Sequence, residues 1–127
     1  MTVDRIAPDI SSGPPPAGSY SPAIASGGFL FLAGQGPFDR QGNKCPGTFR
    51  EEAELAFGNL RDVAEAAGAD LADAVRVGVY LSSMSSFAEL NTIMPRYFGD
   101  PLPARTTIPV SLNGFQIEVD AIVRLRT

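Results

Sequence analysis

Residues 115–125, Phe-Gln-Ile-Glu-Val-Asp-Ala-Ile-Val-Arg-Leu, alternate two kinds of side chain along most of their length. A period of two residues is that of a β-strand, so the stretch predicts a long strand near the end of the chain. One face of this strand carries Phe115, Ile117, Val119, Ala121 and Val123, and the other carries Gln116, Glu118, Asp120, Ile122 and Arg124. The first face belongs in a hydrophobic core.

The dipeptide Asn113-Gly114 stands immediately before this strand. It is favoured in type I′ turns, so we expect residues 105–112 to form the partner strand of a hairpin. Pro109 cannot donate a backbone hydrogen bond, which predicts an edge position or a bulge. Pairing about the turn would set Arg105 or Thr107 near Asp120 or its immediate neighbours, so either Glu118 or Asp120 could neighbour Arg105.

Earlier segments predict further strands. Residues 29–33 are a continuous apolar run, joined to residues 20–25 by the turn signal Gly27-Gly28, and we expect this run to be buried on both faces. Residues 75–81 alternate, and we expect the face that carries Val75, Val77, Val79 and Leu81 to be buried in a core. We expect one more short strand near Val3 to Ala7. Residues 9–19 contain three consecutive prolines and predict an extended loop.

Two helices are expected between these strands. Thr48 and Glu51 form a capping-box pattern, and the helix that starts there should end at Gly68. Residues 86–89, Ser-Phe-Ala-Glu, repeat the pattern at the start of a second helix. Pro95 lies inside that second helix, where it predicts a kink or an early end.

The order β, β, α, β, α, β, β predicts an α+β fold, a single domain over residues 1–127 in which the helices cover one face of a mixed or antiparallel sheet. Two short helices cannot cover both faces. We therefore expect the open face to be covered by oligomerisation.

Composition narrows the class of protein. Of 127 residues, 44% are hydrophobic, and 10 basic against 14 acidic residues give a net charge of −4, which disfavours binding to nucleic acid. Cys45 is the single cysteine, so an intramolecular disulfide and a zinc cluster are excluded and a reducing compartment is expected. We find neither a targeting segment nor a membrane-spanning stretch, and we expect a cytoplasmic protein with no membrane partner.

The chain has no histidine, so any chemistry must use other groups. Arg105 lies between the small residues Ala104 and Thr106, and its guanidinium suits a bidentate contact with a carboxylate. A surface ion pair is the plainer interpretation. Glu118 and Asp120 lie on the less apolar face of the last strand, where a carboxylate could orient water or form a structural salt bridge.

Two other segments are candidates for a pocket wall. Tyr20 follows a glycine-containing turn and could donate a hydrogen bond, although core packing is the default for such a ring. Residues 34–36, Gly-Gln-Gly, offer backbone amides after a strand but fit no phosphate or dinucleotide fingerprint. We interpret them as a close approach of the backbone.

Taken together, these segments resemble the Rid family (reactive intermediate deaminases), which often carries an older endoribonuclease label. The resemblance covers nearly the whole chain. It rests on residues 18–23 (Gly-Ser-Tyr-Ser-Pro-Ala), 33–37 (Ala-Gly-Gln-Gly-Pro), Asn59-Leu60 with 66–68 (Ala-Ala-Gly), Asn91 with Tyr97-Phe98, 103–107 (Pro-Ala-Arg-Thr-Thr) and 117–122 (Ile-Glu-Val-Asp-Ala-Ile).

This resemblance implies a chorismate-mutase-like α+β fold and a homotrimer whose sheets surround a central barrel, with three clefts between subunits. It also implies hydrolysis of 2-imino acids, formed from enamines such as 2-aminoacrylate, to 2-keto acids and ammonia, without a cofactor or a metal. By position, Arg105 would hold the substrate carboxylate, and Glu118 with the backbone carbonyl of Thr107 would position the attacking water. The cleft would be lined by Tyr20, Ala33, Gly34, Gln35 and Asn91.

Two residues depart from the family pattern. Ala33 stands where deaminating members often have serine, and Thr107 where some have cysteine. The resemblance implies a 2-iminobutanoate/2-iminopropanoate deaminase. Three alternatives remain beside it: a Rid-like enzyme specialised to a pathway-specific imine, a noncatalytic trimer that binds small carboxylates or regulates partners, and a ribonuclease. The last fits poorly with the acidic charge and the absence of histidine.

Overall fold

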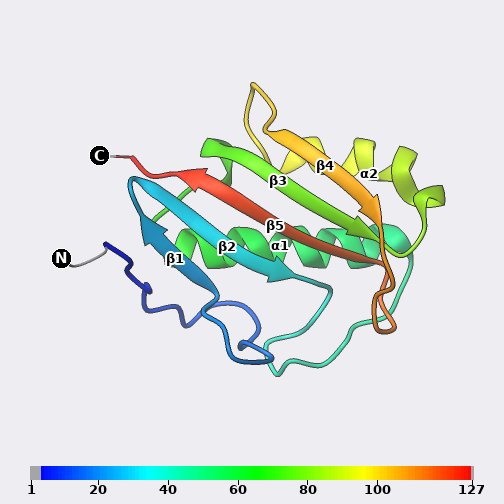
Figure 1. Cartoon of the computed structure of the whole chain (residues 1–127). Coiled ribbons are helices and arrows are strands. Elements are labelled where there is room, and N and C mark those ends of the chain that lie inside the picture. The colour runs from blue at the N-terminus through cyan, green and yellow to red at the C-terminus, as the bar shows by residue number, and fades with distance from the viewer. Residues whose placement is uncertain (1–3, 127) are drawn as a thin grey trace.

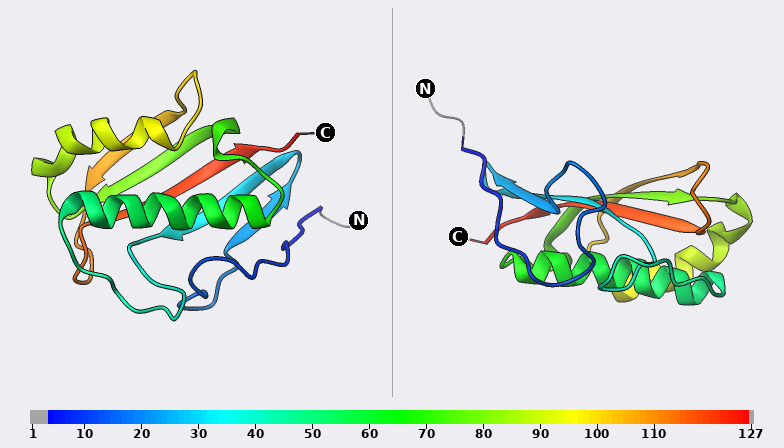
Figure 2. Two further views of the ribbon diagram at one scale, coloured as in Figure 1. Left: turned by 180° about the vertical axis from the view of Figure 1, so that it is seen from behind. Right: turned by 90° about the horizontal axis from the view of Figure 1, so that it is seen from below.

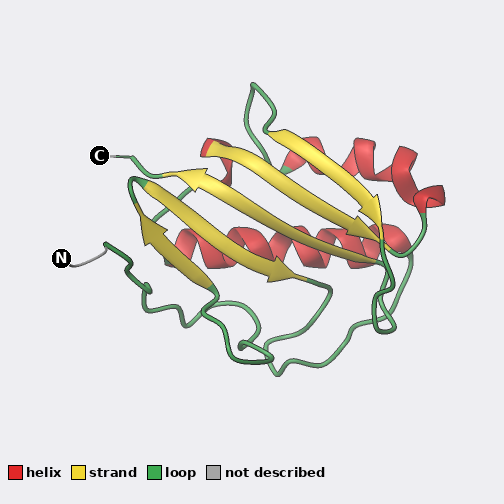
Figure 3. Cartoon of the chain, in the orientation of Figure 1, coloured by secondary structure: helices red, strands yellow, loops and turns green. Residues whose placement is uncertain are grey.

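The computed structural model describes residues 4–126, which form one five-stranded sheet with two main helices packed on one of its faces (Figures 1 and 3). The strands lie in the order β1-β2-β5-β3-β4. Their bounds are β1 Ala23–Ser26, β2 Phe29–Gln35, β3 Ala74–Leu81, β4 Ala104–Pro109 and β5 Ile117–Arg124. The helices are α1, Phe49–Ala66, and α2, Phe87–Ile93, with short 3₁₀ turns at Leu71–Asp73, Met84–Ser86 and Met94–Arg96. The predicted α+β fold is confirmed.

The long alternating strand β5 occupies the centre of the sheet. It pairs antiparallel with β2 on one side and with β3 on the other, and its core-face residues Ile117, Val119 and Val123 are fully buried. The expected hairpin between β4 and β5 is therefore wrong. β4 instead pairs in parallel with β3, which lies between β4 and β5.

The cause of this error lies at the end of β3. Ser82 N–H donates to Gln116 O (3.0 Å), while Val110 N–H donates to Leu81 O (2.9 Å), so the chain between β4 and β5 passes around the end of β3. Gly114 does adopt a positive φ of 83°. A turn signal sets the local direction of the chain, whereas strand pairing depends on which edges the rest of the sheet has already used.

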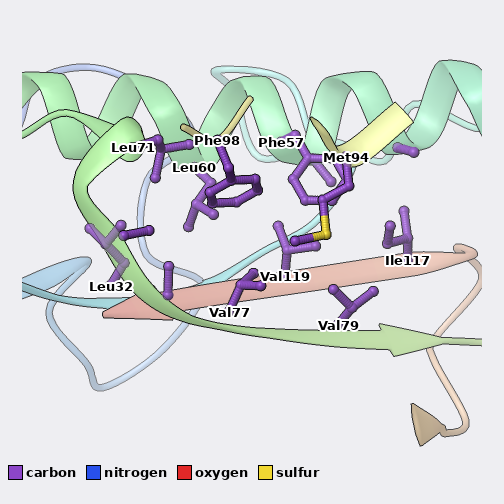
Figure 4. Packing of buried hydrophobic residues seen from close by; sticks show 14 of the residues in the cluster. Leu32, Phe57, Leu60, Leu71, Val77, Val79, Met94, Phe98, Ile117 and Val119 are labelled. Atoms are coloured by element: carbon purple, nitrogen blue, oxygen red, sulfur yellow. The ribbon is translucent and has the colours of Figure 1, made fainter. Parts of the chain in front are cut away.

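Helices α1 and α2 lie side by side on the same face of the sheet, as the view from below shows (Figure 2). Phe57 and Leu60 of α1 reach down onto the sheet, where Val77, Val79 and Val119 point up to meet them (Figure 4). This layer is the core of the molecule. None of the helices in residues 4–126 is long and apolar enough to span a bilayer.

The helix signals are confirmed at α1 but not at α2. Thr48 and Glu51 form the expected capping box, and Gly68 follows the helix end with a φ of 81°. Ser86 makes no side-chain capping bond, because the chain already turns helically at Met84–Ser86 and Ser83 caps that turn instead. The main helix α2 ends at Ile93 and passes into the 3₁₀ turn that contains Pro95, in agreement with the early end expected there.

The opposite face of the sheet is open. Phe31 is 44% exposed on it, so β2 is not buried on both faces as expected. Val75 is 45% exposed as well, because a bulge between Ala74 and Arg76 takes it out of the alternation. Of the further strand expected near the N-terminus, Val3 lies outside the described residues, and Ile6 makes a single antiparallel bridge with Ala25.

Candidate active site

Arg105 and Glu118 lie far apart in the chain's own fold. Glu118 is paired with Tyr80 of β3, and Tyr80 is paired with Ile108 of β4. Since two strand spacings separate β5 from β4, and Arg105 is three residues before Ile108, the two residues are offset by about 10 Å across the sheet and about 10 Å along it. Glu118 is therefore not a neighbour of Arg105 within one copy of the chain.

They also point to opposite faces of the sheet. Arg105 is in register with the buried Val77, and its guanidinium contacts Met94 and Phe87 on the helix side. Glu118 follows and precedes buried core residues in β5, so its side chain points to the open face. The expectation that Arg105 or Thr107 would approach Asp120 across a hairpin is wrong, because β3 separates the two strands.

Glu118 lines a cavity of about 250 Å³ at the edge of the open face, which we call the Glu118 cavity. Tyr20, Gly34 and Gln35 line the same cavity, so the fold brings these four predicted residues together. At Gly34 an added Cβ would lie 2.6 Å from Glu118 Oε2. A side chain at this position would therefore displace the Glu118 carboxylate from its place against the β2 backbone.

The carboxylate of Glu118 has an altered acidity. Burial raises its pKa above the ordinary value of 4.5, and the nearby negative charge of Asp120 raises the pKa further. Asp120 itself accepts hydrogen bonds from Gly78 N–H (3.1 Å) and from the Tyr80 hydroxyl (2.9 Å). The hydrogen bond to Asp120 raises the pKa of Tyr80 above its ordinary value, and burial raises the pKa further.

Two buried polar residues hold the backbone around the Glu118 cavity. Asn59 of α1 donates from Nδ2 to Gly36 O (3.0 Å) and to Phe38 O (2.8 Å). Glu52 accepts from Gln116 N–H (2.8 Å) and from Gln116 Nε2 (2.7 Å), two residues before Glu118. Both sit on the buried face of α1, and polar residues within that apolar stripe were the sequence signal for their role.

The remaining residues expected on this side differ in exposure. Tyr20 is 48% exposed and its hydroxyl accepts from Ala17 N–H (3.0 Å), so the ring does not pack in the core. Gln35 is buried at the bulge where β2 leaves its register with β5. Ala33 donates its N–H to Pro22 O (2.9 Å) and borders the cavity through its neighbour Gly34 without lining it.

Arg105 lines a second cavity, of about 310 Å³, which we call the Arg105 cavity. Asn91 lines it as well, with Met94, Pro95, Leu102 and Pro103. The guanidinium carbon lies 5.3 Å from the centre of the Phe87 ring, and Nη1 lies 3.4 Å from Met94 Sδ. Within residues 4–126 no carboxylate pairs with Arg105. Its donors are held by weak partners and stay available to an anion.

Thr107 presents its backbone at the outer edge of the sheet. Because Val110 N–H donates to Leu81 O, the alternate residues Arg105 and Thr107 direct their N–H and carbonyl groups away from β3. Pro109 has the same orientation, which explains why this edge strand tolerates it. The side-chain Oγ1 of Thr107 is buried and has no hydrogen-bond partner.

No group of three or more potential metal ligands occurs within the described part of the chain. The candidate site consists of two separate surfaces, the Glu118 cavity and the Arg105 cavity. One offers a fixed cation that can hold a carboxylate, and the other offers a partly buried carboxylate that can accept a proton from water. A molecule touching both would have to lie between two copies of the chain.

Comparison with known proteins places these surfaces in context. The sequence pattern of the family described as Endoribonuclease L-PSP matches residues 10–125. A mitochondrial protein of Schizosaccharomyces pombe, mmf2, is 38% identical over 110 residues, covering 83% of this chain and 86% of its own length.

A 2-iminobutanoate/2-iminopropanoate deaminase of Dermatophagoides farinae is 35% identical over 113 residues, which cover 87% of this chain and 88% of that protein. Among solved structures, RidA from the Antarctic bacterium Psychrobacter sp. superposes with a TM-score of 0.87 at 31% identity, covering 94% of this chain and 99% of its own. The similarity extends over both cavities, since residues 10–125 include every residue that lines them.

Proposed function

The chain belongs to the endoribonuclease L-PSP family, in which the Rid proteins are grouped, and on this premise we propose that it hydrolyses 2-imino acids to 2-keto acids and ammonia. One observation carries the proposal. The two charges that this reaction needs, a cation for the carboxylate and a carboxylate for the water, each line a cavity and point to opposite faces of one sheet.

The complete site would form between copies of the chain in a homotrimer, with Arg105 of one copy beside Glu118 of the next. The open face of the sheet supports this arrangement, because it exposes apolar side chains that include Phe31 (44%) and Ile108 (40%). In a cyclic trimer, three such contacts close the assembly and give three equivalent sites.

The reaction then follows from the residues. Arg105 holds the substrate carboxylate through a bidentate contact, which sets the protonated imine carbon opposite Glu118. Water, oriented by Glu118 and by the outward carbonyl of Thr107, adds its oxygen to that carbon while Glu118 takes one proton. Glu118 passes this proton to nitrogen, and the C–N bond then breaks as Glu118 takes the proton of the remaining hydroxyl. A 2-keto acid and ammonia result, and Glu118 returns its proton to the ammonia, which leaves as ammonium. Water is the one co-reactant.

The substrates we propose are reactive 2-imino acids, of which 2-iminopropanoate, formed from the enamine 2-aminoacrylate, is among the smallest. The name of the Dermatophagoides farinae relative supports this class. Ala33 removes the hydroxyl that deaminating members often place there, which favours specialisation to a particular imine over loss of the reaction. Cys45, a free thiol, is compatible with the reducing cytoplasm, although the fission yeast relative is a mitochondrial protein by name. Cell fractionation decides between these compartments.

The proposal is tested by generating imines in place with an amino-acid oxidase and trapping them with semicarbazide. The protein should slow the accumulation of the semicarbazone in proportion to its concentration, and heat-inactivated protein should not. If pyruvate binds but no imine is lost faster, the chain is a carboxylate-binding protein and the enzymatic proposal is wrong. A parallel incubation with RNA tests the activity that the family's description names, and we expect no cleavage.

A further inference from the structure

The Glu118 cavity extends well beyond the carboxylate that lines it. Its other walls are Pro14, Pro15 and Pro16 of the N-terminal loop and the rings of Phe38 and Phe115. These three segments come from different parts of the chain. The cavity therefore has an apolar compartment directly beside the candidate water-positioning group.

The aromatic wall is a built feature. Phe38 and Phe115 meet edge to face, with ring centres 5.2 Å apart. Asn59 holds Phe38 O, and Lys44 Nζ donates to Asn113 O (2.8 Å), which ties the two loops that carry the rings. An added Cβ at Gly36 would lie 2.8 Å from the Phe38 ring, so the backbone leaves room for both rings.

The lining of the Glu118 cavity carries negative charge and no positive charge. Glu118 is its single charged residue, and the cavity contains no cation that could receive an acidic side chain. A cavity of about 150 Å³ with apolar walls accommodates benzene. The 250 Å³ of this cavity exceeds that volume, so it has room for a phenyl or branched aliphatic group beside the reacting carbon.

We infer that the chain acts preferentially on 2-imino acids with a large apolar side chain, of the kind derived from phenylalanine or leucine, over 2-iminopropanoate and over imines with acidic side chains. This inference rests on the proposed function. The side chain would enter the compartment between the prolines and the two rings, while the carboxylate stays at the mouth of the cavity, toward Arg105 of a neighbouring copy.

The test compares imines made by an amino-acid oxidase from phenylalanine, leucine, alanine and aspartate in the semicarbazide assay. We expect kcat/KM to be about tenfold or more higher for the phenylalanine-derived imine than for the alanine-derived imine, because burying apolar groups discriminates by that order. The aspartate-derived imine should be the slowest. Equal rates, or a faster alanine-derived imine, would overturn the inference and leave the proposed function intact.

A substitution at Phe38 tests whether the substrate side chain enters this compartment. Phe38→Leu should lower the ratio of the phenylalanine-derived to the alanine-derived rate, while Phe29→Leu, which changes another half-buried phenylalanine outside the cavity, should leave the ratio unchanged. An unchanged ratio in Phe38→Leu contradicts the placement. If no imine is turned over at all, the proposed function fails, and calorimetry with phenylpyruvate and pyruvate then tests the part of the inference that concerns binding, the preference of the compartment for a large apolar side chain. Tighter binding of phenylpyruvate supports it, and equal or weaker binding overturns it.

Discussion

The Glu118 cavity and the Arg105 cavity are built in different ways. The first gathers the N-terminal loop, the end of β2 and the start of β5, and buried polar residues hold its backbone. The second is local: all of its lining lies between Asn91 and Arg105, along the connection from α2 to β4. The Glu118 cavity, which depends on long-range contacts, carries a carboxylate whose pKa is raised. The Arg105 cavity carries a permanent positive charge.

This difference reflects what each of the two charged groups needs from the fold. A carboxylate that accepts a proton needs controlled burial and neighbouring charges, which long-range contacts provide. A guanidinium needs no adjustment of its pKa and requires only a position. Aromatic and sulfur contacts from Phe87 and Met94 supply that position without neutralising the charge.

The largest effect should come from removing the permanent charge. Arg105→Ala should lower kcat/KM for imine hydrolysis by about 100-fold or more, because the substrate loses a bidentate anchor and its alignment with water. Arg105→Lys keeps the positive charge but loses the bidentate geometry, so its kcat/KM should lie between those of Arg105→Ala and the unaltered protein. Steady-state kinetics measures both. Arg126→Ala, which breaks a surface pair with Asp73, is the matched control, and an Arg105→Ala enzyme of normal activity would contradict the role of Arg105.

Mixing an Arg105 variant with a Glu118 variant tests whether the complete site forms between copies of the chain. Glu118→Gln and Arg105→Ala proteins should each be nearly inactive, whereas co-expressed subunits should recover about a quarter of the normal activity, since random assembly pairs an intact Arg105 with an intact Glu118 in about a quarter of the sites. Co-purification through two different tags verifies the mixture. Mixed assemblies without any recovered activity would show that both residues act within one copy.

A smaller effect is expected on the pH profile of the Glu118 half. Because Asp120 raises the pKa of Glu118, Asp120→Asn should move the acid limb of kcat/KM to lower pH.

The same shift predicts how stability depends on pH. The pKa of Glu118 in the folded protein lies above the unfolded value of 4.5, so ionisation of Glu118 lowers the free energy of unfolding as pH rises between the two values. Glu118→Gln should remove this slope in denaturant titrations.

An acid limb that stays in place in Asp120→Asn would mean that a different group controls it. A guanidinium is permanently charged and so contributes no acid limb, and no variant near the Arg105 cavity should therefore move that limb. A shift caused by Phe87→Leu would therefore contradict the division between the two halves.

The smallest effect concerns Thr107. Its buried hydroxyl has no hydrogen-bond partner, so Thr107→Val should raise the free energy of unfolding by about 1 kcal/mol. If the backbone carbonyl is the functional group, kcat/KM should change by less than about twofold, because the substitution leaves the main chain in place. Thermal and urea denaturation measure the first effect. A large loss of activity with normal stability would assign the role to the hydroxyl instead.

Much of the molecule follows from local sequence patterns. The alternation in β5, the capping box at Thr48 and the turn at Gly27-Gly28 each predict an element that the structure contains. These signals are reliable because period, capping and positive φ act over a few residues. The site residues that the resemblance implied include Tyr20, Gly34, Gln35 and Glu118 of one cavity and Asn91 and Arg105 of the other, whereas Ala33 lines neither cavity and the aromatic wall was not predicted.

The order of the strands in the sheet could not be predicted from local sequence patterns. Asn113-Gly114 predicted a neighbouring pair, but the sheet placed β3 between β4 and β5. The side chains of Arg105 and Glu118 consequently point to opposite faces, where the hairpin would have set them close together. Exposure of Phe31 and Val75 was missed for a related reason, since burial depends on which layer covers a face and on where a bulge interrupts the register.

The sequence alone determined the elements of this protein and the identity of its two charged groups, because secondary structure and side-chain chemistry depend on residues close together in the chain. The tertiary structure alone decided that these groups lie on separate surfaces, that Glu118 is partly buried beside Asp120, and that an apolar compartment adjoins it. Such properties arise from contacts between segments up to about 100 residues apart, and they depend on how the whole sheet is ordered.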